Sequence, residues 1–261
     1  MPEPGYEYYG MMAQTWDLFR GDTSKWEDRG FYLDIIRESG EPVLDVGCGT
    51  GRLLLDFMSQ GVDIDGVDNS PEMLKLCREK AEALGLKPTL YENSMESMNL
   101  PRRYQTIIVP SSSFQLVLEP GQAQQAILNL FLHLMVDGSL VMPFMQEWKR
   151  GDPLESDWRL TGEKRRLEDG ATIRRWSKSR YDPETQLEHT EDRYEAIRDG
   201  VTIASEYHSR SPATREYTQC QALDLFAKAG FVDLRVYKGF TRLPASEEEE
   251  IFSIIAKRPI G

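Results

Sequence analysis

The sequence predicts an α/β fold built on a doubly wound, mostly parallel β-sheet. Segments of strand character alternate with amphipathic helical segments along most of the 261 residues, and this alternation is typical of a parallel sheet with helices on both faces. Residues 43–52 run from the first strand through a glycine-rich turn into the next helix. Between residues 149 and 215 the pattern changes to a polar, two-residue alternation, which favours antiparallel strands.

Three strand–helix units make up the first part of the predicted sheet. The strands are short and mostly apolar, as expected for strands that are covered on both faces. We expect these strands at residues 42–46, 63–67 and 88–91. The helices that alternate with them are expected at residues 26–38, 51–59 and 71–84.

The second part of the sheet flanks the polar region. Two strands and a helix precede it, and a helix and two strands follow it. The strands are expected at residues 105–109, 139–142, 231–237 and 251–257, and the helices at residues 122–134 and 218–229. Gly230 ends the last helix. The sheet therefore has seven strands, and a ligand is expected beyond the carboxyl ends of the strands.

The pattern of the polar region predicts an antiparallel meander. Its strands are expected at residues 171–181, 186–197 and 201–210, with turn signals at Asp182-Pro183 and Asp199-Gly200 between them. The insertion contains 14 basic and 14 acidic residues, so its net charge is zero. A neutral sheet lacks the basic footprint that nucleic-acid binding requires.

The glycine-rich turn indicates a nucleoside site of a particular kind. Its glycines have G-x-G-x-G spacing, and Asp68 ends the second strand. Bare backbone lets a ligand approach closely, and a carboxylate at that strand end can bind ribose hydroxyls. A dinucleotide fingerprint would require glycine where Arg52 stands, so NAD is disfavoured. Asp45 places a carboxylate at the mouth of the turn, where it suits an ammonium or a sulfonium cation.

These residues resemble the first motif and the ribose-binding acid of the class I S-adenosylmethionine-dependent methyltransferases, whose sheet is Rossmann-like. Residues 69–74 and 93–95 are similar to the segments of that family that contact adenine, although Ser94 stands where many relatives have Asp. The resemblance implies S-adenosyl-L-methionine as cofactor and S-adenosyl-L-homocysteine as product. The contacts it implies are Asp45, Gly47, Cys48, Gly49, Asp68, Asn69, Met73, Asn93, Ser94, Met95 and Pro110.

The N-terminal segment is similar to the arm that folds over the cofactor in glycine-type N-methyltransferases. Tyr9 and Trp16 are the expected contacts, because an aromatic face attracts a sulfonium cation. The alternative is that these aromatic side chains only anchor the terminus to the core. The predicted organisation is a helical arm over residues 1–40, a methyltransferase core over residues 41–148 and 216–261, and the antiparallel insertion over residues 149–215.

The resemblance also implies a role for the insertion. In similar small-molecule N-methyltransferases an antiparallel sheet at this place covers the active site as a lid and helps to pair subunits. A lid would exclude water around the sulfonium and hold the acceptor in line. Pairing of two copies into a homodimer stays open at this point, and so does the alternative of a surface decoration.

Composition excludes several classes of partner. The chain carries 31 basic and 43 acidic residues, a net charge of −12, which disfavours nucleic acid and anionic membranes. No apolar run of about 18 residues and no signal-peptide pattern is present. The three cysteines and three histidines lack the spacing of metal ligands. We expect a cytoplasmic protein without a metal.

Methyl transfer from a sulfonium mainly needs alignment of the reactants. If a general base is needed, the candidates are His189 and Glu147, with His208 as a further one, and Tyr194 or Tyr207 would orient the acceptor. Each of these side chains has a structural role as its alternative. Residues 111–113 are all serine and follow the fourth strand, so they should line the cleft.

The sequence therefore favours an S-adenosylmethionine-dependent methyltransferase that acts on the nitrogen, or less readily the oxygen, of a small molecule. A Pro-Pro-aromatic motif and a Pro-Cys nucleophile, which characterise nucleic-acid base methylases, are both absent from the sequence. Two alternatives stay open. One is methylation of a protein or tRNA, and the other is a cofactor-binding regulatory module without turnover.

Overall fold

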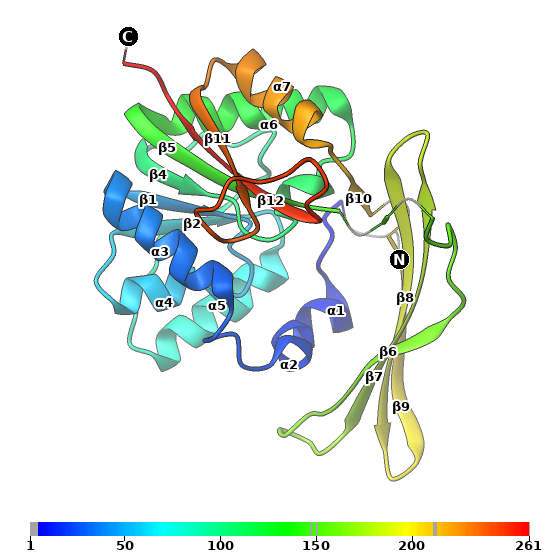
Figure 1. Ribbon diagram of the computed structural model, residues 1–261. Helices are drawn as coiled ribbons and strands as arrows, with labels where there is room; N and C mark the ends of the chain where they lie inside the picture. The colour runs from blue at the N-terminus through cyan, green and yellow to red at the C-terminus, as the bar shows by residue number, and fades with distance from the viewer. Residues whose placement is uncertain (1–4, 147, 150, 211–212, 261) are drawn as a thin grey trace.

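The computed structural model describes residues 5–146, 148–149, 151–210 and 213–260. A helix-covered core holds the first and last parts of the chain, and a long antiparallel sheet stands at its side (Figure 1). The N-terminal helices lie between these two parts. The chain thus contains a helix-covered sheet and a separate antiparallel sheet.

The core sheet has seven strands in the order β11-β12-β5-β4-β1-β2-β3. Only β12 runs against both of its neighbours, because β5, β4, β1, β2 and β3 pair in parallel and β12 pairs antiparallel with both β5 and β11. The strands are β1 Val43–Val46, β2 Ile64–Asp68, β3 Leu90–Glu92, β4 Tyr104–Ile108, β5 Leu134–Met145, β11 Val232–Lys238 and β12 Ile251–Lys257. The predicted fold class is confirmed. The final hairpin differs in one respect from a simple edge pair, since β12 inserts between β5 and β11.

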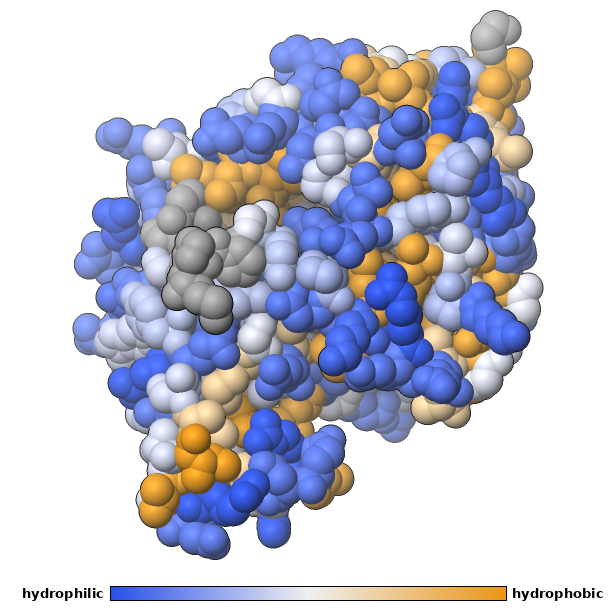
Figure 2. All heavy atoms as spheres, turned by 180° about the vertical axis from the view of Figure 1, so that it is seen from behind, coloured by the Kyte–Doolittle hydropathy of each residue, from blue (hydrophilic) through white to orange (hydrophobic). Residues whose placement is uncertain are grey.

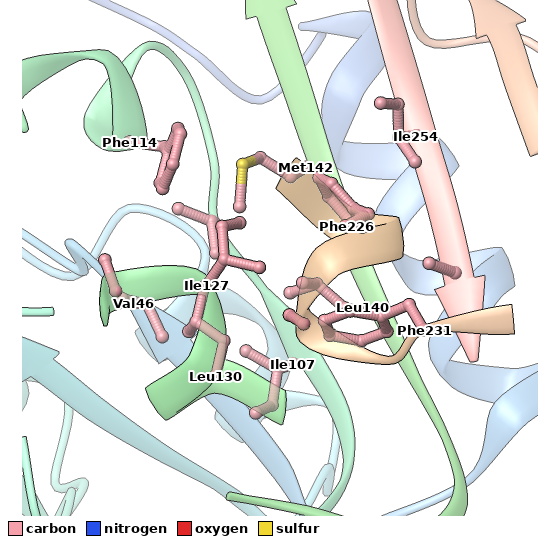
Figure 3. Close-up of a cluster of buried hydrophobic side chains, with 14 of the residues drawn as sticks. Val46, Ile107, Phe114, Ile127, Leu130, Leu140, Met142, Phe226, Phe231 and Ile254 are labelled. Carbon is pink, nitrogen blue, oxygen red and sulfur yellow. The ribbon is translucent and has the colours of Figure 1, made fainter. Parts of the chain in front are cut away.

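Helices cover both faces of this sheet. On one face are α3 Glu27–Ser39, α4 Leu54–Ser59 and α5 Pro71–Ala83, and on the other are α6 Pro120–His133 and α7 Gln219–Ala229. Figure 3 shows the packing under the second face, where Ile127 and Leu130 of α6 and Phe226 of α7 meet Leu140 and Met142 of β5. These side chains are fully buried, so they anchor the strands whose ends form the site.

Local chemistry sets the limits of the helices. At the start of α5, the Ser70 hydroxyl accepts a hydrogen bond from the Met73 N–H, and Pro71 occupies the first turn. Thr218 and Gln221 form a capping box at the start of α7. The helix predicted from residue 51 begins only at Leu54, because Gly51 has φ +84°, outside the helical region.

The insertion is a five-stranded antiparallel sheet. Its three long strands were predicted and two short ones, β6 and β10, were not. The strands are β6 Arg159–Arg165, β7 Thr172–Asp182, β8 Leu187–Arg198, β9 Val201–Ser209 and β10 Thr214–Arg215. Because side chains alternate along a strand, Tyr194 and Ala196 of β8 lie on the face that packs against the N-terminal segment.

The N-terminal arm contains two short helices, α1 Gly10–Gln14 and α2 Trp16–Arg20. Met11 and Met12 of α1 pack against Ile173 and Tyr194 of the insertion. On the side of the core, the Ser70 hydroxyl donates a 2.5 Å hydrogen bond to the Tyr8 carbonyl. The arm is therefore held between the core and the insertion sheet.

The surface seen from behind is mostly hydrophilic, with small apolar areas between charged side chains (Figure 2). Within the described residues, no helix combines the length and the apolar character needed to cross a membrane.

Candidate cofactor and methyl-transfer site

A cavity of about 620 Å³ opens at the carboxyl ends of β1, β2 and β4. This volume lies in the usual range for small-molecule sites. All the cofactor residues that the sequence predicted line this one cavity. They are Tyr9, Trp16, Asp45, Gly47, Cys48, Gly49, Asp68, Asn69, Met73, Asn93, Ser94, Met95 and Pro110.

The glycine turn is hydrogen-bonded to the end of β2. The Val67 carbonyl accepts hydrogen bonds from the N–H groups of Gly47 and Cys48, at 2.8 and 3.1 Å. A Cβ at position 47 would stand 2.7 Å from Ser113 Oγ, so this glycine is needed for the close approach of the serine segment. Burial raises the pKa of the Cys48 thiol; the thiol thus stays protonated and serves packing rather than redox chemistry.

Asp68 closes the turn from the other side. Its Oδ2 accepts a 2.8 Å hydrogen bond from Gly49 N–H, and its Oδ1 accepts one of 2.9 Å from Ser70 N–H. Burial raises the pKa of Asp68, and these backbone donors oppose that effect. A carboxylate has about four lone-pair sites, so each oxygen keeps capacity for one hydroxyl of a ribose.

Asp45 lies deeper, at the carboxyl end of β1. It is buried, and its Oδ1 has no hydrogen-bond partner among the described residues. Burial raises the pKa of this carboxyl group to about 7, although the nearby Arg52 opposes the effect. An unsatisfied buried acceptor costs about 1–3 kcal/mol, so a positively charged ligand group at this position would relieve the cost.

Arg20 supplies the opposite charge. Its guanidinium stacks on the Trp16 ring at 3.8 Å and lines the cavity, and no ion pair joins it to any described carboxylate. Burial lowers the pKa of Arg20, but a guanidinium still stays charged. Arg20 and Asp45 together therefore match the carboxylate and the ammonium of an amino acid, which is the group at one end of S-adenosylmethionine.

A second wall of the cavity is made by residues 111–113 and 116–119, with Ser209 and Arg210 of the insertion. Arg210 Nε lies 3.1 Å from Glu7 Oε1 and 3.5 Å from Asp192 Oδ2. Sequence reasoning found the serines but missed Glu7, Arg20 and Arg210. The sequence does contain a signal for Arg20, because it lies four residues after Trp16 and hence on the same face of a helix. Nothing in the local pattern distinguishes Arg210.

Of the side chains predicted to be catalytic, His189 and Tyr194 do not line this cavity. Tyr194 lies on the face of β8 that packs against the arm, with its ring 6.3 Å from Phe19 and 5.4 Å from His208. His189 lies on the opposite face of β8. His208 is fully buried beside the ring of Tyr9, and Tyr207 is exposed.

Glu147, the other predicted base, lies outside the described residues. The described residues that line the cavity include no histidine. A histidine base is therefore not what this arrangement provides.

The insertion covers less of the cavity than its predicted role as a lid suggests. Of the described insertion residues, only Ser209 and Arg210 line the cavity. Residues 5–9, Trp16 and Arg20 of the arm form the direct cover, and the insertion supports the arm from outside.

Known proteins resemble this chain in sequence around the site and in fold. Residues 43–138, which span the glycine turn, Asp68 and the serine segment, match the methyltransferase domain family. Within residues 43–138 the sequence is that of a methyltransferase domain. Over 69 residues, 25% of this chain and 23% of the relative, the sequence is 38% identical to human glycine N-methyltransferase. The chain spans less than half the length of the curated relatives it matches first.

Solved methyltransferases resemble the whole chain in fold. An S-adenosylmethionine-dependent methyltransferase from Clostridium acetobutylicum has a TM-score of 0.75 at 18% identity, covering 95% of this chain and 98% of that one. An amino pentose methyltransferase from Micromonospora echinaspora, solved with S-adenosylmethionine bound, has a TM-score of 0.67 at 20% identity, with 98% and 100% covered. The similarity extends beyond the core of the methyltransferase domain, since it includes the insertion and the arm.

We expect binding of S-adenosylmethionine by the methyltransferase domain to strengthen as pH rises through 7. Asp45 is mostly protonated at pH 6 and mostly ionised at pH 8, because its pKa is about 7, and only the ionised form attracts the ammonium. Calorimetry should show the dissociation constant falling about tenfold over this interval. The Asp45→Asn variant should lose this pH dependence, and an equally steep dependence in that variant would contradict the assignment.

The free energy of unfolding of the ligand-free protein should decrease as pH rises toward 7, whereas cofactor binding strengthens. The folded pKa of Asp45 lies above the ordinary value of 3.8, so the folded state binds more protons between about pH 4 and 7. The contribution of Asp45 to stability is therefore lost as pH rises through that interval.

Proposed function

We propose that this protein transfers the methyl group of S-adenosylmethionine to the nitrogen, or less readily the oxygen, of a small-molecule acceptor. The observation that carries the proposal is the continuity of one cavity from the glycine turn and Asp68 to a second wall at Ser111, Ser112 and Arg210. A module that only binds the cofactor would not need this second wall. The cover formed by the arm also suits a small acceptor better than a protein or tRNA.

The chain's own groups would align the reactants. Asp68 would hold the ribose of the cofactor, while Asp45 and Arg20 would fix its amino-acid end. When bound, S-adenosylmethionine supplies an activated methyl group: a C–N bond forms as the S–C bond breaks, and the electron pair stays on sulfur. The amine must arrive unprotonated or lose its proton to water, and the alignment supplies most of the rate.

An amine is the favoured acceptor for two reasons. The described residues that line the cavity include Glu119, whose carboxylate would attract a protonated amine before it loses its proton. The relatives named above act on an amino pentose and, by name, on the nitrogen of glycine. The net charge of −12 likewise disfavours a nucleic-acid acceptor.

The test combines calorimetry with a screen for product. The purified chain should bind S-adenosylmethionine and S-adenosylhomocysteine but not NAD. Incubation with S-adenosylmethionine carrying a labelled methyl group and pools of amino sugars, amino acids and other small amines should yield S-adenosylhomocysteine and one labelled product. Binding of NAD in place of S-adenosylmethionine would refute the proposal. Cofactor binding without product in any amine or alcohol pool would favour the regulatory module instead.

A further inference from the structure

The helix α2 has little to hold it in place by itself. It contains five residues, none of them buried, and a helix of this length is unstable alone. Yet Trp16 and Arg20, at its two ends, line the cavity. On the outer side Phe19 packs against Gly162, where a Cβ would stand 2.6 Å from the Phe19 ring. The position of α2 over the cavity therefore depends on its contacts with the insertion on one side and with the core on the other.

One polar cluster joins α2 to the core. Thr50 Oγ1 donates a 2.7 Å hydrogen bond to Asp17 Oδ1 and accepts one of 3.0 Å from Lys80 Nζ. Lys80 Nζ also lies 2.8 Å from Asp17 Oδ2. An ammonium has no acceptor, so the Thr50 hydroxyl must accept from Lys80 and has its single proton left for Asp17. The three groups satisfy one another in a closed ring.

The ring connects three elements with different roles. Thr50 belongs to the glycine turn and is buried, whereas the side chains of Asp17 and Lys80 are 47% and 38% exposed. Lys80 comes from α5 and does not line the cavity. Asp17 lies between Trp16 and Arg20 in the arm. The ring thus ties the turn beneath the cofactor site to the helix above it.

We propose that Asp17, Thr50 and Lys80 form a latch that keeps the arm closed over the cofactor and sets the rate at which the cofactor leaves. This inference rests on the proposed function, since it takes S-adenosylmethionine and S-adenosylhomocysteine as the ligands. Asp17, Thr50 and Lys80 act as positioning residues: they hold Trp16 and Arg20 in place, and opening of the latch precedes release of the product. Because two of the three groups are half-exposed, the latch is weak enough to open repeatedly.

The experiment measures release of S-adenosylhomocysteine by stopped-flow tryptophan fluorescence, for which Trp16 is a reporter in the arm. Lys80→Met and Thr50→Val should each dissociate about three to ten times faster than the natural protein. Thr50→Ser keeps the hydroxyl and should restore the natural rate. Lys75→Met is the matched control, because Lys75 lies on the same helix in an exposed 3.9 Å pair with Glu79; it should leave the rate unchanged.

Three further measurements separate the latch from a general loss of structure. The double variant Asp17→Asn/Lys80→Met should be no faster than Lys80→Met alone, because both changes open the same ring. Added salt should speed release from the natural protein more than from Lys80→Met, and melting temperatures should confirm that each variant is folded. Natural release rates in both Lys80→Met and Thr50→Val would overturn the latch. Failure of the natural protein to bind S-adenosylhomocysteine would instead refute the proposed function.

Discussion

Replacement of Asp68 by alanine should abolish most of the binding of S-adenosylmethionine. The variant loses the carboxylate that we assign to both ribose hydroxyls, and hydrogen bonds to a charged group contribute about 1.5–3 kcal/mol each. The dissociation constant should rise at least about 100-fold, since every 1.4 kcal/mol is a factor of ten. Calorimetry with S-adenosylmethionine measures this directly. Part of the loss will come from the glycine turn, because Gly49 N–H also donates to Asp68.

Asp65 offers a matched control for this experiment. It lies on the same strand and is similarly buried, but it accepts a hydrogen bond from the Tyr104 hydroxyl at 3.0 Å and does not line the cavity. Asp65→Ala should therefore lower the melting temperature while the affinity for S-adenosylmethionine stays near the natural value. Equal losses of affinity in the two variants would mean that general destabilisation, and not a ribose contact, explains the Asp68 result.

The cofactor half of the site could be predicted because its signals are local. Gly47, Gly49 and Asp68 come from one strand–turn–helix–strand unit, and their spacing alone sets their relative positions. The order of strands and helices follows in the same way, since periodicity reports which face of each element is buried. The ends of the helices are less well defined by the sequence: α4 begins at Leu54, three residues after the predicted start.

The second wall of the cavity, which we propose faces the acceptor, could not be predicted because it depends on contacts between distant segments. Arg210 reaches the cavity from the end of β9 and meets Glu7 of the arm, two residues that are far apart in the sequence. His189 and Tyr194, which the sequence suggested for catalysis, do not line the cavity for a related reason. Alternation shows that neighbouring residues of a strand lie on opposite faces, but it does not show which face is near the ligand, and here the arm lies in between.

The glycine turn also provides the sharpest prediction about stability. Gly51 has φ +84°, and a Cβ there would stand 2.6 Å from Cys77 Sγ and 2.8 Å from Leu55 Cγ. Gly61 has nearly the same backbone angle, φ +87°, but a Cβ at that position would have no neighbouring atom within 4 Å among the described residues. The two positions thus separate the cost of the left-handed backbone from the cost of crowding.

We expect Gly61→Ala to lower the free energy of unfolding by about 1 kcal/mol, which is the backbone cost alone. Gly51→Ala should lower it by about 3 kcal/mol, because overpacking of a buried site adds about 1–3 kcal/mol. Urea unfolding of both variants measures the difference. If the two losses were equal, Cys77 and Leu55 would have moved aside without cost, and the turn would be less tightly packed against α5 than the structure shows. A larger loss at position 51 would instead mean that Gly51 is required for the turn to pack on α5, and with it for the placement of Thr50 beside Lys80.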